Sequence, residues 1–358
     1  MTAKILIVGA GPSGLTLALE LARQGIQIDI IDQKAEPSTL SRAVGILPIT
    51  MKLLGPSGAA ALIAKQSIVI ENAVFYDKTR KITRLALDQM KDPQERMFSL
   101  PQDRTESILR DLLQEHDITV RYHSELTSLE QTDEQVTVSI NGETQSYDYV
   151  IGADGVKSPC RELAGIDFPG YELDEHWSIA DVYIDNARYS RDFNIHLNGH
   201  GQVILIIPLE AKRIRIISNT DDALHNLPAA LKVREIKRTG KFRIGIHQAS
   251  EYQKGRIFLV GDAAHCHSPV GGRGMNLGIA DAVDLASRFV DGGLENYHSH
   301  RHPIAAKVIA STERARKIML SSNWFSRSLA LLFLRFVSKI GFLNKFFLEK
   351  VVLAGDTV

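Results

Sequence analysis

The sequence predicts an α/β fold in which a Rossmann-like parallel sheet is interrupted by an inserted antiparallel sheet and followed by C-terminal helices. Three observations support this fold class. Residues 4–24 contain an apolar run, a glycine-rich turn and a helical pattern. Short apolar runs return at residues 146–151 and 256–260, as expected of buried parallel strands. Between these two runs, residues 178–218 alternate like consecutive strands with short turns.

Length and composition narrow the function. At about 150 residues per domain, a chain of 358 residues corresponds to about two domains. The chain is 44% hydrophobic and 23% charged, which excludes a disordered protein. Its 42 basic and 42 acidic residues balance, so no nucleic-acid partner is expected. With only two cysteines, and a first apolar run that is too short to span a membrane and leads directly into a glycine-rich turn, we expect a cytoplasmic protein.

The first half of the chain is expected to begin with one βαβ unit. Residues 4–8 and 26–31 are its strands, and apolar residues at helical spacing over 15–24 predict the helix between them. Residues 33–61 are expected to form loops and short helices. Thr105 or Asp103 is a plausible cap for a helix over 105–115. Further strands are expected at residues 67–76, 81–87, 119–122, 126–131, 135–140 and 146–151, with a hairpin turn at Asn141-Gly142.

The second half is expected to contain the antiparallel sheet and then helices. The strand candidates of this sheet are residues 178–184, 193–197, 203–208 and 213–218. A buried strand at 256–260 is followed by a glycine-rich loop, a helix at 275–289 and a long helix at 304–321. Residues 324–353 are apolar and basic with helical spacing.

The first turn has the spacing of a dinucleotide-binding fingerprint. Gly9, Gly11 and Gly14 follow a strand and open a helix, with Pro12 and Ser13 between them. In such turns the glycines permit a tight bend, close approach to a pyrophosphate and close helix–strand packing. Asp32 ends the next strand, where a carboxylate can accept hydrogen bonds from an adenosine ribose. The alternative is a strand–helix turn without a ligand, and the motif does not choose between FAD and NAD(P).

Two further motifs make that choice. One is YVIGADGVKSPCR at residues 149–161, and the other is RIFLVGDAAHCHSPVGGRGMN at residues 256–276. Together with the first turn, they resemble the three signatures of the class A FAD-dependent aromatic monooxygenases, in particular the phenol and hydroxyphenylpropionate hydroxylase branch. The resemblance extends from residue 2 to about residue 320. It implies a discontinuous FAD-binding domain (1–72, 98–172 and 255–320) around a substrate domain (73–97 and 173–254), with a helical tail at 321–358.

The resemblance also implies roles for single residues. Asp262 would bind the ribityl chain of FAD, and Asp154 and Gly155 would contact FAD and the nicotinamide. Pro269 would face the substrate with its carbonyl. Apart from the resemblance, His196 is a candidate base for a phenol proton because a neutral imidazole can accept it, and the alternative is a structural histidine of the strand. Whether the strand side with His196 or the side with Ile195 lines the pocket stays open. The remaining cofactor residues implied are Arg42, Gln102, Gly261, Gly271, Gly272, Gly274, Met275 and Asn276.

The implied reaction is hydroxylation of a phenol-like or related small aromatic. NAD(P)H would reduce FAD as a transient co-substrate, and O₂ would add at C4a of the flavin to give a hydroperoxide. The alternatives are a flavin oxidase or reductase without oxygen insertion, a membrane-associated quinone-pathway hydroxylase, and a non-catalytic flavin-binding protein. We expect a monomer or a homodimer.

Two features suggest functions that we do not favour. His265-Cys266-His267 and the alternating His298, His300 and His302 suggest a metal site, but the first group lies in the flavin loop and the second is expected to be a solvated linker. No metal is therefore expected. The basic, apolar tail suggests contact with a membrane surface, and a helix that covers the fold or an oligomer interface is the favoured interpretation.

Overall fold

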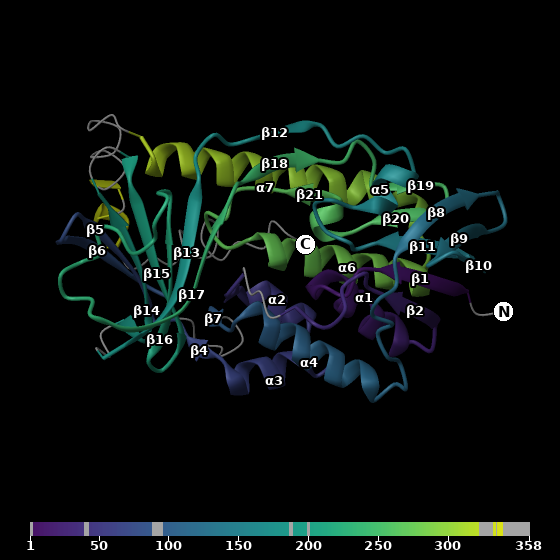
Figure 1. The fold of residues 1–358 in the computed structure, drawn as a ribbon, viewed down its shortest axis with the longest axis horizontal. Helices are drawn as coiled ribbons and strands as arrows, with labels where there is room; N and C mark the ends of the chain where they lie inside the picture. Colours follow the sequence, from purple (N-terminus) through teal and green to yellow (C-terminus); the bar gives the residue numbers. More distant parts are fainter. Residues whose placement is uncertain are drawn as a thin grey trace.

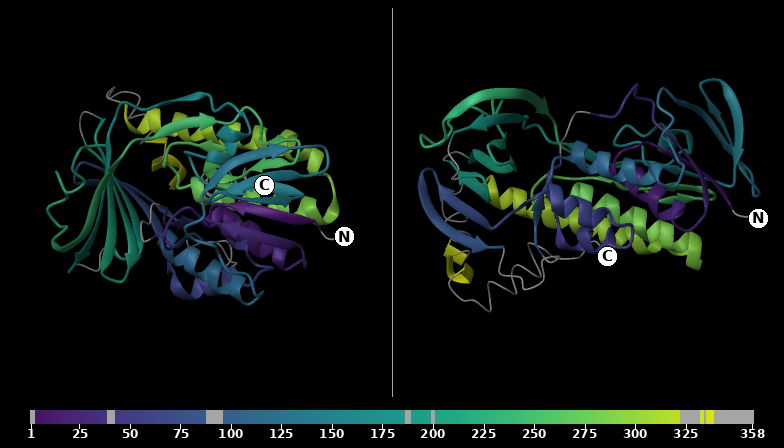
Figure 2. Two further views of the ribbon diagram at one scale, coloured as in Figure 1. Left: turned by 45° about the vertical axis from the view of Figure 1, so that its right-hand side comes forward. Right: turned by 90° about the horizontal axis from the view of Figure 1, so that it is seen from below.

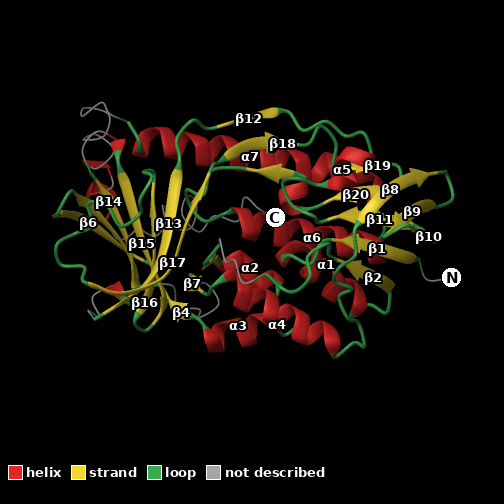
Figure 3. Cartoon of the chain, in the orientation of Figure 1, coloured by secondary structure: helices red, strands yellow, loops and turns green. Residues whose placement is uncertain are grey.

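The computed structural model describes residues 3–38, 43–87, 96–185, 189–198, 201–321, 332–333 and 335–338. Two large sheets dominate it, and Figure 3 shows most helices gathered around one of them. The predicted tail helix lies almost wholly outside the described residues, as does Arg42. Among the helices described, none combines the length and apolar character needed to cross a membrane.

The first sheet brings together three segments that are far apart in the sequence. Its strand order is β19-β20-β11-β1-β2. All pairs are parallel except β19 with β20. The strands are β1 (Lys4–Val8), β2 (Gln27–Ile31), β11 (Tyr149–Gly152), β19 (Gln253–Lys254) and β20 (Ile257–Leu259). The strands predicted at 4–8, 26–31 and 256–260 are therefore confirmed within a residue or two. The strand predicted at 119–122 is reduced to one bridge between Ile31 and Arg121.

Four long helices accompany this sheet. They are α1 (Pro12–Ala22), α4 (Gln102–Gln114), α6 (Gly274–Asp291) and α7 (Tyr297–Met319). Side chains from all four join the strands in one apolar core, which we call the cofactor core. The cap predicted for α4 is wrong, because the helix begins at Gln102 behind Pro101 and Thr105 is buried inside it. The predicted start of α7 at residue 304 is also wrong, so His298, His300 and His302 lie in a helix rather than a linker.

Smaller elements surround the cofactor core. Asn141 and Gly142 both have positive φ and form the predicted hairpin. That hairpin belongs to the meander β8 (Leu126–Gln131), β9 (Val136–Ile140) and β10 (Glu143–Tyr147). Helices α2 (Pro48–Leu53), α3 (Ala59–Gln66) and α5 (Pro159–Leu163) are short. Two more three-stranded sheets are formed by β3 (Gly45–Ile46), β7 (Phe98–Ser99) and β4 (Ile68–Val69), and by β12 (Gly170–Glu172), β18 (Gly245–Gln248) and β21 (His265–Cys266).

The second large sheet has seven strands in the order β17-β13-β16-β15-β14-β5-β6. It is antiparallel except for the parallel pair of β14 and β5. Its strands are β5 (Asn72–Asp77), β6 (Arg80–Ala86), β13 (Trp177–Ile184), β14 (Asp192–Leu197), β15 (Val203–Glu210), β16 (Arg213–Ser218) and β17 (Val233–Phe242). Strand β17 was not predicted, and the strand predicted at 67–76 is divided between β4 and β5.

Each face of this sheet has its own apolar core. Ile195 and Leu205 on one face join Ile309, Met319 and Leu320 from α7 and its end, in what we call the sheet core. The other face packs against the segment around residues 223–231. Figures 1 and 2 show α7 extending from the five-stranded sheet to the seven-stranded sheet. The helix therefore contributes side chains to both the cofactor core and the sheet core.

Candidate functional site

The turn between β1 and α1 packs directly on the end of β11. Gly9 has φ +107°, and a Cβ there would meet the carbonyl oxygen of Ala153 and lie 2.8 Å from Asp154 Cα. A Cβ on Gly14 would meet the Gly9 carbonyl oxygen and lie 3.2 Å from Ala153 Cβ. The first and second motifs therefore touch through positions where only glycine fits.

Other glycines of the three motifs face open space instead. Among the residues that the structure describes, a Cβ on Gly11 or on Gly274 would meet nothing within 4 Å, and neither residue has a positive φ. Gly155 and Gly272 are equally open, although their positive φ gives each an independent reason to be glycine. Neither the backbone conformation nor the protein's own packing requires glycine at Gly11 and Gly274. This fits a cradle in which a cofactor occupies the space next to the backbone.

Asp32 closes the first turn from the end of β2. Its Oδ2 accepts the Ala10 N–H at 3.0 Å and its Oδ1 accepts the Lys34 N–H at 2.9 Å. The side chain is buried, and each carboxylate oxygen can still accept a further hydrogen bond. Asp32 lies at the end of β2 and its ribose contact stays a prediction, while the carboxylate has a structural role that the sequence did not indicate.

The second motif forms a strand end, a tight turn and the short helix α5. Ser158 caps α5 by accepting the Arg161 N–H at 2.9 Å, and Asp154 Oδ2 accepts the Cys160 N–H at 2.9 Å. Burial raises the pKa of Asp154 to about 6, and the bonds from Ser158 and Cys160 oppose the rise. The carboxyl group of Asp154 therefore titrates closer to neutral pH than an exposed aspartate does.

Arg161 links the second motif to the third, which the sequence did not indicate. Its guanidinium donates to the carbonyl oxygens of Val156 and Ala263, both at 3.0 Å. It also lies 3.8 Å above the ring of Phe168. Because Ala263 belongs to the turn η4 (Gly261–Ala263), the buried arginine fixes this turn against the second motif.

The third motif also contacts the first. Gly261 has φ +60°, and a Cβ on it would meet Ser13 Oγ and lie 3.6 Å from Gly278 Cα. A Cβ on Gly278 would in turn lie 3.0 Å from Gly261 Cα. Helices α1 and α6 therefore approach each other closely at Ser13. The sequence identified Ser13 and Gly261 but missed Gly278, because a helical glycine carries no spacing signal of its own.

The loop before α6 is tied down by its own residues. The Pro269 carbonyl accepts the Gly272 N–H at 3.0 Å. Asn276 Oδ1 accepts from Leu47 N at 2.9 Å and Thr50 Oγ1 at 2.7 Å. Its Nδ2 donates to the carbonyls of Gly45 at 2.9 Å and Gly272 at 2.7 Å. The amide of the predicted cofactor residue Asn276 is thus engaged by the protein itself, and Met275 packs partly buried against the cofactor core.

The histidines and cysteine of the third motif are not grouped as metal ligands. Within the described part of the chain, no cluster of three or more His, Cys, Asp or Glu side chains could hold a metal ion. Burial lowers the pKa of His267 to about 4, and burial raises the pKa of the Cys266 thiol to about 12. At neutral pH both side chains are therefore uncharged.

Two other predicted residues lie in different surroundings. Gln102, at the start of α4, accepts the Ala43 N–H at 3.1 Å and donates to Glu106 at 2.9 Å, so it fastens the segment that follows Arg42. His196 lies in β14, opposite Ile204 of β15, on the sheet face that packs against residues 223–231. Its ring stacks on Tyr76 at 4.3 Å, and its Nδ1 lies 3.1 Å from the Lys78 carbonyl oxygen. The structure thus places His196 on the sheet face opposite Ile195.

Curated proteins similar to this chain include several monooxygenases. The 6-methylpretetramide 4-monooxygenase of Streptomyces rimosus is 31% identical over 353 residues, which cover 89% of this chain and 63% of that protein. The pentachlorophenol 4-monooxygenase of Sphingobium chlorophenolicum is 28% identical over 350 residues, covering 89% and 65%. The chain thus spans slightly less than two thirds of the length of these relatives.

Solved structures share the fold over nearly the whole chain. The p-nitrophenol 4-monooxygenase PnpA from Pseudomonas putida DLL-E4 superimposes with a TM-score of 0.89 at 21% identity, covering 97% of this chain and 96% of that one. The Diels-Alderase PyrE3 of pyrroindomycin biosynthesis gives a TM-score of 0.82 at 26% identity, covering 99% and 81%.

The family assignment rests on a match that includes all three motifs. The model described as FAD binding domain matches residues 2–226 and 221–312. These ranges contain the cradle glycines and both large sheets. The chain therefore belongs to this family, described as FAD binding domain, and its cofactor is FAD.

Proposed function

We propose that this chain uses FAD and NAD(P)H to insert one oxygen atom of O₂ into a phenol-like or related small aromatic. The observation that carries the proposal is the cradle at Gly11 and Gly274, where neither backbone nor packing requires glycine. The similarity to a pentachlorophenol 4-monooxygenase supports a phenol as the substrate. Bound FAD, once reduced by NAD(P)H, supplies the electrons that activate O₂.

The residues of the three motifs would hold this cofactor. The N-terminus of α1, with Gly9, Gly11, Pro12, Ser13 and Gly14, would bind the pyrophosphate through free N–H groups. Asp32 would bind the ribose, and Asp262 would bind the ribityl hydroxyl groups. The isoalloxazine ring would lie against Gly271, Gly272, Gly274 and Met275. The N-terminus of α6 would stabilise negative charge on the reduced ring. Asp154 and Gly155 would contact FAD and the visiting nicotinamide.

The seven-stranded sheet would close the substrate pocket, with residues 73–97 and 173–254 as the substrate domain. We place the substrate on the face that carries Ile195, because this face packs towards α7 while the His196 face is covered by residues 223–231. Apolar side chains on this face would exclude water from the reacting centre. The Pro269 carbonyl would face the substrate from the flavin loop.

The test begins with the purified protein and its absorption spectrum. We expect flavin bands, and we expect a panel of phenols to accelerate NAD(P)H consumption, with ¹⁸O from ¹⁸O₂ recovered in the product. A protein that neither carries nor binds added FAD contradicts the proposal. Flavin binding without NAD(P)H turnover on any aromatic would instead support a non-catalytic role.

A second candidate is a flavoprotein reaction without oxygen insertion. It is favoured by the likeness to the Diels-Alderase PyrE3, which covers 99% of this chain at 26% identity. Isotope labelling separates the two candidates, because only a monooxygenase transfers ¹⁸O from ¹⁸O₂ into its product. A modified aromatic product without the label would favour this second candidate.

A further inference from the structure

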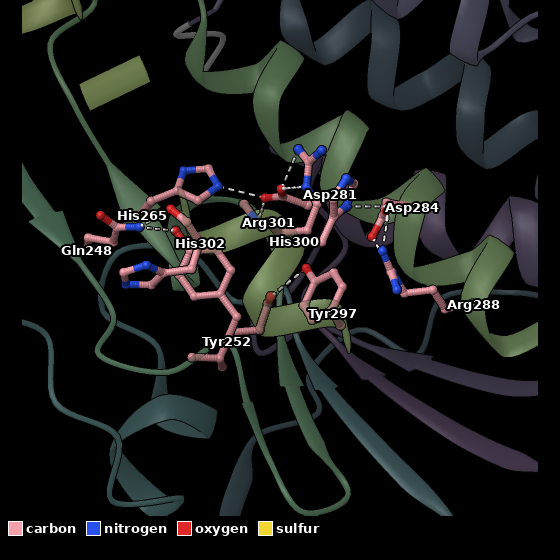
Figure 4. A network of polar contacts seen from close by, with 12 residues as sticks. Gln248, Tyr252, His265, Asp281, Asp284, Arg288, Tyr297, His300, Arg301 and His302 are labelled. Carbon is pink, nitrogen blue, oxygen red and sulfur yellow. Dashed lines mark hydrogen bonds and ion pairs between the residues drawn. The ribbon is translucent and has the colours of Figure 1, made fainter. Parts of the chain in front are cut away.

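A buried ion cluster lies beneath the loop that carries Asp262. Asp281 on α6 is fully buried, and so are His265 and Arg301 within a margin of 1% exposure. Asp281 Oδ2 lies 2.6 Å from His265 Nε2, and Asp281 Oδ1 lies 2.8 Å from Arg301 Nε and 2.7 Å from a terminal guanidinium nitrogen. Figure 4 shows the carboxylate between the imidazole of His265 and the guanidinium of Arg301.

The same carboxylate reaches both ends of the loop at residues 261–265. Gly261 N donates to Asp281 Oδ2 at 3.2 Å, and His265 at the other end donates to the same oxygen. The Ala264 N–H closes the turn on the Gly261 carbonyl at 2.9 Å. One oxygen of a buried aspartate therefore fixes the start and the end of the loop, while Arg301 on α7 holds the other oxygen.

The middle of this loop is held from the opposite direction. Arg161 of the second motif donates to the Ala263 carbonyl at 3.0 Å. Between these fixed points the side chain of Asp262 is exposed. The backbone that carries Asp262 is thus held through its neighbours by contacts to three other parts of the fold: α6, α7 and the second motif.

The imidazole of His265 has one hydrogen-bond partner among the described residues, Asp281. Its Nδ1 is buried and has no hydrogen-bond partner among the described residues. A hydrogen on Nδ1 would be a buried donor without an acceptor, whereas Nε2 lies 2.6 Å from an Asp281 oxygen and can donate to it. The ring is therefore a single donor aimed at Asp281.

We propose that Asp281, His265 and Arg301 are positioning residues of the flavin site. By holding both ends of loop 261–265, they set where Asp262 presents its carboxylate to the hydroxyl groups of FAD. The inference rests on the proposed role of Asp262. It predicts that losing the hydrogen bond between His265 and Asp281 weakens FAD binding, and does more than lower stability.

The chain offers a matched control on the same helix. Asp284 on α6 is also paired with a guanidinium, at 2.7 Å to Arg288 Nε, and its other oxygen lies 3.1 Å from His300 Nδ1. Its side chain is 19% exposed. Figure 4 shows this pair of contacts beside the cluster, directed away from His265. Asp284→Asn removes a charged partner from α6 without touching loop 261–265.

The experiment measures FAD affinity of the full chain by flavin fluorescence titration, at a temperature where each flavin-free variant is folded by circular dichroism. His265→Leu and Asp281→Asn should raise the Kd for FAD by about tenfold or more, because each breaks a buried hydrogen bond to a charged group. His265→Gln should stay within about threefold, because its amide can donate in place of Nε2. Asp284→Asn should leave the Kd unchanged.

The outcomes distinguish failure of the proposed function from failure of the positioning role. If wild-type protein binds no FAD, the proposed function fails. If wild-type protein binds FAD and His265→Leu binds as tightly as His265→Gln, the positioning role is overturned and the proposed function stands. Should Asp281→Asn fail to fold, the pair of His265 variants decides the question alone, since both remove the ring and only one keeps the donor.

Discussion

Single glycines in the first motif have separable functions. Gly11→Ala should leave the stability of the flavin-free protein unchanged or raise it by up to about 1 kcal/mol, because φ is ordinary and the space is open. The added Cβ would occupy the place of the pyrophosphate, so the Kd for FAD should rise about tenfold or more. Urea unfolding of the flavin-free protein and a fluorescence titration with FAD measure the two effects.

Gly9→Ala is the contrasting variant. Its φ of +107° alone should cost about 1–3 kcal/mol, and the overlap with the Ala153 carbonyl adds to this cost. Gly9→Ala should therefore lower the free energy of unfolding of the flavin-free protein, whereas Gly11→Ala should not. Unaltered FAD binding by Gly11→Ala would show that the cofactor does not use the open space at Gly11.

The buried carboxyl of Asp154 makes stability depend on pH in a defined direction. Its pKa is about 6 in the fold against an ordinary 3.8, so the folded state holds the proton more tightly. The resulting stabilisation is complete below pH 3.8 and is lost as the pH rises through 6, an effect of about 2–3 kcal/mol. Asp154→Asn should therefore gain stability relative to wild type between pH 4 and about pH 7.

His267 provides a control of opposite sign. Its pKa falls to about 4 from 6.5, so its stabilising contribution exists above pH 6.5 and is lost as the pH falls towards 4. His267→Gln should gain stability relative to wild type as the medium is acidified. Urea unfolding of the flavin-free proteins across this range tests both signs, and parallel curves for Asp154→Asn and wild type would contradict the assignment.

Spacing in the sequence identified the motif residues but not all of the contacts that they make. The glycine triplet was readable because its turn is local. Gly278 and Arg161 were missed as site residues because their partners, Ser13 and Ala263, come from distant segments. Asn276 was predicted as a cofactor residue, and its four hydrogen bonds to protein became visible only in three dimensions.

At the scale of elements, the sequence predicted the strands that are either buried runs or show a regular alternation of apolar residues. The strands β1, β2 and β20 are buried runs, and β13 to β16 followed the predicted ranges closely. Strand β17 was missed because it lies at a sheet edge with mostly exposed, charged side chains and therefore no apolar alternation. Helix α7 was predicted to begin at residue 304, directly after Pro303. The helix contains this proline, and the carbonyl that the proline leaves unbonded belongs to the exposed Ser299.

Asn276 connects elements that the sequence separates by more than two hundred residues. Asn276→Ala would leave the buried Leu47 N–H and Thr50 hydroxyl without their acceptor, and the carbonyls of Gly45 and Gly272 without their donor, at the junction of β3, α2 and α6. We expect a loss of about 2–4 kcal/mol in the free energy of unfolding, measured by urea denaturation. The exposed Asn296, whose side chain bonds to the adjacent Glu295, is the control and should change stability by less than about 0.5 kcal/mol when replaced by alanine.

At the scale of the whole molecule, α7 contributes side chains to the cores beside both large sheets. Tyr297, Ala305 and Val308 belong to the cofactor core, while Ile309 and Met319 pack on the sheet core. The buried residues of α7 belong to two different cores. The sequence therefore predicted a helix here but not the two apolar cores that the helix contacts. Because one helix supports both cores, we expect them to unfold together.

Trp177 reports on this coupling because it is buried in the sheet core and belongs to none of the three flavin motifs. The chain has only one other tryptophan, Trp324, so Trp324→Phe leaves Trp177 as the single probe. FAD at one hundred times its Kd should stabilise the folded state by about 2.7 kcal/mol. If the cores unfold together, the wavelength shift of Trp177 and the loss of bound flavin should move to the same higher urea concentration. If the urea midpoint of the Trp177 signal stays the same with and without FAD, the sheet core unfolds independently of the cofactor core. In that case α7 does not couple the two cores.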